Sequence, residues 1–398
     1  MSVTAAAGFE AAGIASGIKP DGVPDLALVA TVDRRPVSAA GVFTTNLATA
    51  APVQVSRESL ADGHAAAVIL NSGNANAATG EQGRRDARRM CELTARELGC
   101  VPEEVLVCST GLIGVPLPMG PIDAGIPKLA GALAADEAAG EAAADAILTT
   151  DTVRKMARAD VALDGRTATV AGIAKGAAML APAMATMLAV LTTDAAVEPK
   201  ALHDALSSAV TDTFNALLVD GCTSTNDTVL ALAGGAAGNA PITESGSDFP
   251  ALAGALEQVC ADLAGQMAAD AEGATKRARV VVRGARSNED ARRAARGVAA
   301  SQLVQCSLNG GDPYWGRVLS ELGASGAALD PERVDIAYNG ITVCRSGVAA
   351  DHDGSALDRV MAGSEVEITC DLKEGSDEAA VLFTDLSHAY IDENRGTS

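Results

Sequence analysis

Aromatic residues make up only 2% of the 398-residue sequence, although 48% of its residues are hydrophobic. A core with so few rings must be assembled from Ala, Val, Leu and Ile, and this composition is typical of a globular protein rather than a disordered one. No apolar run approaches the ~20 residues that a membrane-spanning helix needs. We therefore predict a folded chain, long enough for two or three domains, without a transmembrane segment.

Positive charge is also scarce, because the sequence has 30 Lys and Arg but 51 Asp and Glu, which gives a net charge of −21. A surface this acidic repels nucleic-acid phosphates and anionic lipids, so neither is an expected partner. The segment "MSVTAAAGFEAAGIASGIKPDG" lacks the basic stretch and apolar block of a signal peptide. The eight cysteines form no CxxC pair and no zinc spacing, which favours reduced, core-packed thiols in a cytoplasmic protein without a metal site.

The common catalytic signatures are missing as well. The sequence has four histidines, none of them in HExxH, and it contains no GxSxG elbow, GxGxxG fingerprint or Walker loop. A Ser-His-Asp hydrolase and a nucleotide-binding fold are therefore poor interpretations, and we expect no cofactor.

Short apolar segments alternate with amphipathic and Ala-rich stretches, and hairpin signals recur at Asp164-Gly165 and Asn339-Gly340. This mixture predicts an α/β protein with mixed sheets. Strands are expected at 25–31, 38–43, up to Leu70, up to Cys108, after Thr186, and at 278–285, 365–371 and 379–384, and helices at 80–98, 121–148, 199–218, 249–270 and 287–303. A Gly-containing turn is expected at Ser109–Gly114.

Thr186 is the best candidate for a catalytic residue, because it stands between the small-residue run "APAMA" and the apolar segment "MLAVLTT". A threonine hydroxyl needs a base beside it, and cleavage of the chain before Thr186 would supply one in the new α-amino group. The pKa of such an amine is about 8, which suits a general base at neutral pH. A strand-start threonine without any function is the competing interpretation.

One signature segment and seven further blocks of sequence favour the catalytic interpretation. The segment "KGAAMLAPAMATMLAVLTTDA" resembles the signature of the ornithine acetyltransferases, also called glutamate N-acetyltransferases, and the similarity covers essentially the whole chain. Further blocks resemble that family in the right order, namely "VILNSGNANAATG", "CSTGLIG", "AILTTDT", "DGCTSTNDTV", "AEGATKR", "GGDPYWGRV" and "TDLSHAYIDEN".

The resemblance implies a four-layer α/β/β/α sandwich related to the DmpA aminopeptidases, with a smaller α/β C-terminal domain. It also implies self-cleavage between Ala185 and Thr186, which gives an α chain of residues 1–185 and a β chain of residues 186–398 that associate as an α2β2 heterotetramer. In structural terms we expect a core sandwich over 1–280 and a C-terminal domain over 281–398, whose tail returns to the site.

Family roles pass to matching positions of this sequence. Thr186 would be the nucleophile, and Thr110 with Gly111 would form the oxyanion hole, which needs two donors and close backbone approach. The residues that would bind substrate are Thr149, Lys175, Thr186, Glu272, Asn394 and Ser398, with Thr397 as the alternative to Ser398.

The implied activity is transfer of acetyl from N2-acetyl-L-ornithine to L-glutamate through an acetyl-Thr186 ester, a step of arginine biosynthesis. Acetyl-CoA is an open second substrate. A hydrolase or aminopeptidase on the same scaffold and a non-catalytic binding homologue stay open as alternatives. The sequence departs from the family pattern at Ala177-Ala178, where a glycine with positive φ would be replaced, and at Ala183, Cys222 and Tyr314. We expect Cys222 to pack in the core.

Overall fold

The computed structural model describes residues 1–181 and 187–395. It divides into two compact units: Met1–Gly176, Ala183–Asn215 and Thr223–Met267 form the first, and Ala177–Pro182, Ala216–Cys222 and Ala268–Ser398 form the second. The main segment of the second unit therefore begins before the expected boundary near residue 281. Within the described residues, no helix combines the length and the apolar character that crossing a membrane requires.

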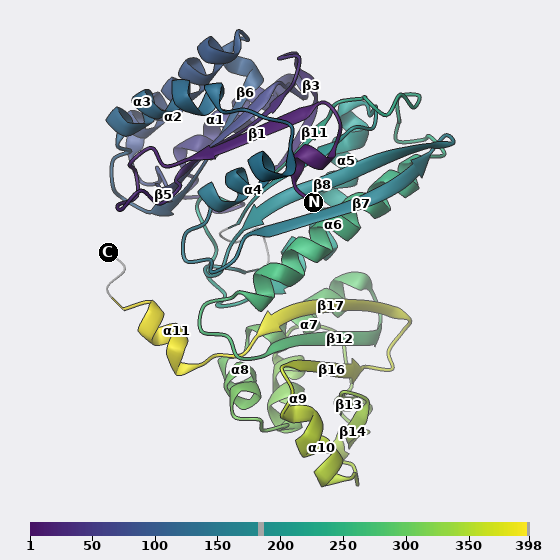
Figure 1. The fold of residues 1–398 in the computed structure, drawn as a ribbon. Helices are drawn as coiled ribbons and strands as arrows, with labels where there is room; N and C mark the ends of the chain where they lie inside the picture. Colours follow the sequence, from purple (N-terminus) through teal and green to yellow (C-terminus); the bar gives the residue numbers. More distant parts are fainter. Residues whose placement is uncertain (182–186, 396–398) are drawn as a thin grey trace. The chain divides into compact units, whose positions relative to one another are not determined.

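The first unit contains two β-sheets (Figure 1). The four-stranded sheet has the order β1-β2-β5-β6, and the six-stranded sheet has the order β4-β3-β11-β9-β8-β7. Both are mixed: β5 pairs with β6 and β9 with β11 in parallel, while the remaining neighbours are antiparallel. The strands are β1 Phe9–Ile14, β2 Leu26–Thr31, β3 Val37–Phe43, β4 His64–Ala65, β5 Ala67–Asn74, β6 Val105–Leu112, β7 Lys155–Leu163, β8 Arg166–Lys175, β9 Leu188–Thr193 and β11 Thr228–Ala233.

Several helices of the first unit cover the outer faces of the two sheets. One apolar cluster joins the four-stranded sheet to α2 and α3, and a second lies between the sheets and includes alanines of α4. On the six-stranded sheet, α5 contacts β3 and β11, and Gln266 of α6 bonds to the backbone of Met156 in β7. These layers confirm the α/β/β/α sandwich. The helices are α1 Ala51–Ser59, α2 Gly80–Leu98, α3 Met119–Gly131, α4 Glu137–Ala146, α5 Pro199–Asp212 and α6 Phe249–Ala269, with short 3-10 turns at Val3–Ala5, Leu60–Asp62, Pro102–Glu104 and Phe214–Ala216.

The second unit is a seven-stranded mixed sheet of order β10-β17-β12-β16-β13-β14-β15, packed against helices around one apolar core. Its strands are β10 Leu217–Leu218, β12 Arg277–Ala285, β13 Asp335–Tyr338, β14 Ile341–Arg345, β15 Val348–Ala349, β16 Glu365–Asp371 and β17 Asp377–Thr384. Its helices are α7 Asn288–Ala300, α8 Gln302–Asn309, α9 Trp315–Ala324, α10 Gly354–Met361 and α11 His388–Glu393.

The prediction of a single helix over 121–148 is wrong, because this segment forms two helices, α3 and α4. Between α3 and α4 the chain is not helical, and Ala134 forms a β-bridge to Ala11 of β1. Asp136 then caps α4 by accepting the N–H of Ala139. In the same way α7 ends at Ala300 and Ser301 caps a separate helix, α8. A side chain that accepts backbone N–H groups at a helix start is the local reason for each break.

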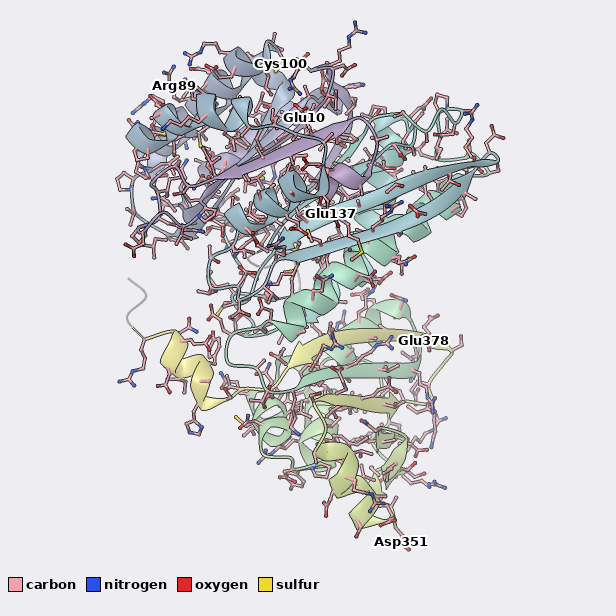
Figure 2. All side chains as sticks on the ribbon, viewed as in Figure 1. Glu10, Arg89, Cys100, Glu137, Asp351 and Glu378 are labelled. Carbon is pink, nitrogen blue, oxygen red and sulfur yellow. The ribbon has the colours of Figure 1, made fainter. Side chains whose placement is uncertain are left out.

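The helix expected at 199–218 is also too long, since α5 ends at Asp212 and the chain enters β10 at Leu217. Five of the eight cysteines are buried, whereas Cys222 and Cys306 are exposed, so the expectation that Cys222 packs in the core is wrong. The acidic surplus lies partly on the surface, where Glu137 of the first unit and Asp351 and Glu378 of the second are exposed (Figure 2).

Candidate active site

Thr110 and Gly111 lie inside β6, which runs on to Leu112, so the turn expected at Ser109–Gly114 is wrong. The strand continues because β5 also extends, and Gly111 pairs with Gly73 of β5. A Cβ on Gly111 would lie 2.3 Å from the carbonyl carbon of Gly73, and the φ of Gly111 is 133°. Only glycine fits this position. Thr110 is buried while Gly111 is exposed, so the strand presents an accessible backbone beside a buried hydroxyl.

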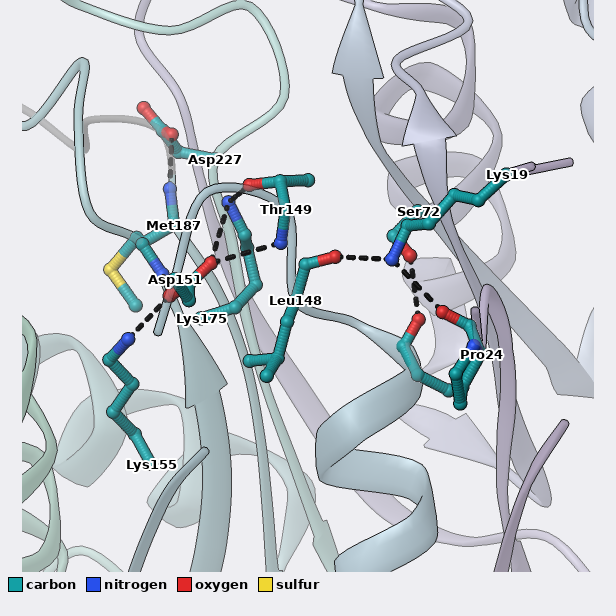
Figure 3. A network of polar contacts seen from close by, with 12 residues as sticks. Lys19, Pro24, Ser72, Leu148, Thr149, Asp151, Lys155, Lys175, Met187 and Asp227 are labelled. Carbon is teal, nitrogen blue, oxygen red and sulfur yellow. Dashed lines mark hydrogen bonds and ion pairs between the residues drawn. The ribbon is translucent and has the colours of Figure 1, made fainter. Parts of the chain in front are cut away.

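The structure brings Thr149 and Lys175 together, as Figure 3 shows. Lys175, the last residue of β8, donates a hydrogen bond of 2.7 Å from its Nζ to Oγ1 of Thr149. The Lys175 side chain is only 3% exposed. It is therefore a buried cation at the end of a strand and not a solvated surface charge, the usual state of lysine.

Asp151 is a site residue that the sequence reasoning missed. Its side chain is fully buried, and its Oδ1 accepts hydrogen bonds from Nζ of Lys155 at 2.6 Å and from the N–H of Gly176 at 2.7 Å. Its Oδ2 accepts the N–H of Thr149 at 3.1 Å and lies 3.6 Å from Nζ of Lys175. Burial opposes its ionisation, but Lys175 and Lys155 outweigh burial and hold the Asp151 pKa well below its usual range.

A loop before β2 reaches the same region. The buried carboxylate of Asp25 accepts the backbone N–H groups of Ser16, Gly17, Ile18 and Lys19, which fixes the shape of this loop. Lys19 donates from Nζ to the carbonyl oxygens of Pro24 at 2.9 Å and Leu148 at 2.6 Å (Figure 3). Burial lowers the pKa of Lys19. Lys19 thus ties this loop to the residue that precedes Thr149.

Thr186, Ala185 and Ala183 lie outside the described residues, and the neighbourhood of Thr186 is known through the next residue. The N–H of Met187 donates a hydrogen bond of 2.9 Å to Oδ1 of Asp227, and no part of Asp227 is exposed. Burial raises the pKa of Asp227 well above its usual range.

In the second unit, Glu272 and Asn394 form a hydrogen bond of 2.7 Å from Nδ2 to Oε2. Glu272 is buried, and its N–H donates to the carbonyl oxygen of Ala177. Thr397 and Ser398 lie outside the described residues. The structure thus pairs the predicted residues within each unit, Thr149 with Lys175 and Glu272 with Asn394.

The departures from the family pattern have clear structural outcomes. Positive φ values occur at Gly176 and at Met179, but not at Ala177 or Ala178, so the strain considered for Ala178 is not present. Burial and the nearby Asp220 carboxylate raise the pKa of the Cys222 thiol, which disfavours a reactive thiolate although the residue is exposed. Tyr314 places its ring near the Arg317 guanidinium.

Comparison with known proteins settles the relationship of the chain. A model of the ArgJ family matches residues 10–396. The chain belongs to the ArgJ family. The arginine biosynthesis bifunctional protein ArgJ of Symbiobacterium thermophilum is 49% identical over 391 residues, which cover 98% of this chain and 96% of that protein.

The protein of the same name from Mycobacterium leprae is also 49% identical, over 100% of this chain and 96% of that protein. A solved structure of arginine biosynthesis bifunctional protein argJ from Bacillus halodurans is 34% identical, with a TM-score of 0.50, and covers 52% of this chain and 96% of that chain. The family resemblance expected from the signature segment and the seven further blocks is therefore confirmed.

Proposed function

We propose that this ArgJ-family chain cleaves itself between Ala185 and Thr186 and then transfers acetyl from N2-acetyl-L-ornithine to L-glutamate. The observation that carries the proposal is the 49% identity to arginine biosynthesis bifunctional proteins over nearly the whole chain. The solved Bacillus halodurans chain supports the cleavage, because it matches over 96% of its own length and yet spans only 52% of this chain.

In the first half-reaction, the α-amine of Thr186 takes the proton from Oγ, and this oxygen attacks the acetyl carbonyl of N-acetylornithine. Thr110 and Gly111 stabilise the oxyanion, and loss of one such donor typically costs about 3–4 kcal/mol of transition-state stabilisation. The amide C–N bond breaks, the leaving amine of ornithine takes the proton, and an acetyl ester remains on Thr186.

In the second half-reaction, the α-amine of glutamate attacks this ester, and the ester C–O bond breaks as Oγ regains its proton. Each substrate has a carboxylate that Lys175 and Thr149 would bind. The carboxylate of Glu272, held by Asn394, would attract the side-chain ammonium of ornithine.

Both relatives are called bifunctional, which supports a second activity for this chain as well. We propose acetyl-CoA as the second acetyl donor, with glutamate as the acceptor. Formation of N-acetylglutamate from acetyl-CoA in the absence of N-acetylornithine tests this point. We further propose that the cleaved chains assemble as α2β2 in the cytoplasm.

The decisive experiment is replacement of the nucleophile. The wild-type chain of 39.8 kDa should run as two bands of about half that mass on a denaturing gel, and Thr186→Ala should stay whole and inactive. Thr186→Ser, which keeps a hydroxyl, is the matched variant and should still be cut. A whole wild-type chain would favour a non-catalytic homologue, and acetate as the product in the presence of glutamate would favour a hydrolase.

A further inference from the structure

Two consecutive buried polar residues, Asn226 and Asp227, stand immediately before β11. Asn226 donates from Nδ2 to the carbonyl oxygens of Ala75 at 2.6 Å and of Ser109 at 2.9 Å. Ser109 directly precedes Thr110. Asp227 accepts the N–H of Met187, which directly follows Thr186. One dipeptide is therefore bonded both to the neighbour of the proposed oxyanion residue and to the neighbour of the proposed nucleophile.

Burial of both polar side chains is unfavourable unless they form these hydrogen bonds. Asn226 is 3% exposed and Asp227 is 0% exposed, and burying such polar groups costs free energy that only hydrogen bonds recover. Oδ2 of Asp227 has no hydrogen-bond partner in the described part of the chain, so the carboxyl contributes through its other oxygen. Packing alone would not favour two adjacent residues of this kind at the start of a fully buried strand.

The dipeptide also joins three segments that are distant in sequence. β11 pairs with β9, which begins one residue after Met187. Ser109 lies within β6 of the other sheet, and Ala75 directly follows β5 of that sheet. The Asn226 side chain is thus a direct bond between the two sheets at the strand end that carries Thr110.

We propose that Asn226 and Asp227 are positioning residues that set the place of Thr110 relative to Thr186. This inference rests on the proposed function, because it assigns the two threonines their roles. Asn226 fixes the backbone before the oxyanion residue, and Asp227 fixes the backbone after the nucleophile. An error of about 1 Å between attacking and stabilising groups lowers rates by about 100-fold, so a short, rigid connection between them has a catalytic use.

The test uses single replacements of the two side chains in the full-length chain. Asn226→Asp exchanges the donating amide for an oxygen that faces two carbonyl oxygens, and Asp227→Ala removes the acceptor for Met187. We expect both to lower kcat for acetyl transfer by about 100-fold with little change in KM, and Asp227→Ala also to slow self-cleavage. Asp227→Asn keeps an acceptor oxygen and should rescue cleavage and most of kcat.

A matched control separates positioning from stability. Asn239 is likewise buried and donates to two backbone carbonyl oxygens, those of Ala196 and Ala240, in the same unit. Asn239→Asp should lower the melting temperature about as much as Asn226→Asp but leave kcat within about twofold.

The outcomes are distinct. If Asn226→Asp and Asn239→Asp lower kcat equally, or if Asp227→Asn is as inactive as Asp227→Ala, the positioning proposal is wrong. If the wild-type chain cleaves itself and yet transfers no acetyl group, the proposed function fails, while the effect of the Asp227 variants on cleavage still tests the inference.

Discussion

The amide of Asn394 donates a hydrogen bond of 2.7 Å to the carboxylate of Glu272, so the two residues form a fixed pair in the second unit. A carboxylate held in this way is oriented, and an oriented carboxylate can form charge-assisted hydrogen bonds with a positively charged group. The substrates proposed for this chain differ at this point, since ornithine has a side-chain ammonium and glutamate has a second carboxylate.

Glu272→Gln should therefore separate the two substrates. Removal of the negative charge is expected to raise KM for N-acetylornithine about tenfold, equivalent to ~1.4 kcal/mol, while KM for glutamate stays the same or falls. Steady-state kinetics with each substrate varied in turn measures both constants. An equal rise in both would show that Glu272 does not recognise the ammonium group. Glu393, which is exposed on the neighbouring helix, provides the control variant Glu393→Gln.

Gly111→Ala should abolish most of the activity. The new Cβ would lie 2.3 Å from Gly73, so the two strands must separate and the backbone N–H moves away from the oxyanion. We expect kcat to fall at least ~100-fold, in line with the loss of an oxyanion donor. Gly114→Ala is the matched control, because Gly114 also has positive φ but has open space around its Cβ position. Full activity in Gly111→Ala would remove this residue from the mechanism.

Asp227 should make the stability of the folded chain depend on pH. Its pKa is raised in the folded state by burial, whereas an Asp in an unfolded chain titrates near ~3.9. The folded state therefore binds more protons, and stability falls as the pH rises from about 4 towards the folded pKa. The side chain of Asp227→Asn does not ionise, so this variant does not lose stability in that pH range. Its melting temperature should exceed that of the wild-type chain at pH 7, and the difference should shrink towards pH 4. Parallel curves for the two proteins would contradict the raised pKa.

The buried pair Asp151–Lys155 offers a double-mutant test of substrate binding. Asp151→Asn leaves the buried ammonium of Lys155 beside a neutral amide and should cost about 3–5 kcal/mol of stability. The double variant Asp151→Asn with Lys155→Met removes the charges of this pair and should recover part of that stability, because the buried ammonium of Lys175 still lies beside the neutral amide.

The double variant should not restore KM, although it should restore part of the stability. In both variants the carboxylate no longer holds Lys175 and Gly176, so KM for both substrates should stay raised about tenfold. Asp204→Asn, at an exposed lysine pair of the same i,i+4 spacing with Lys200, is the control and should change neither quantity. Recovery of KM together with stability would mean that Asp151 contributes to the fold alone.

The sequence was informative wherever local chemistry determines the backbone. Asp164-Gly165 and Asn339-Gly340 have the positive φ values that a tight hairpin needs, and both hairpins form where they were predicted. In contrast, "STGL" at the end of β6 has the composition of a turn, and it is extended because β5, more than 30 residues away, supplies its partner.

The same limit applies to the candidate site. Lys175 and Glu272 were placed by family resemblance, and nothing local to them indicates that they are buried. Asp151, Asn226 and Asp227 stand in polar tracts that look like ordinary loops, and their contacts become visible only when distant strands are brought together. In "DTVRK", the sequence shows only that a Lys follows Asp151 by four residues, and the burial of both side chains is visible only in the fold.

The order of strands in the six-stranded sheet has a consequence for the proposed cut. β9 and β11 come from the sequence after Thr186, and they lie side by side between β3 and β8, which come from the sequence before it. After cleavage, two strands of one polypeptide would lie between strands of the other. Backbone hydrogen bonds would join the two polypeptides at both borders, between β3 and β11 and between β8 and β9. Separation of the two products would require both of these ladders of hydrogen bonds to break, so the proposed cleavage would leave the strand order of the sheet unchanged.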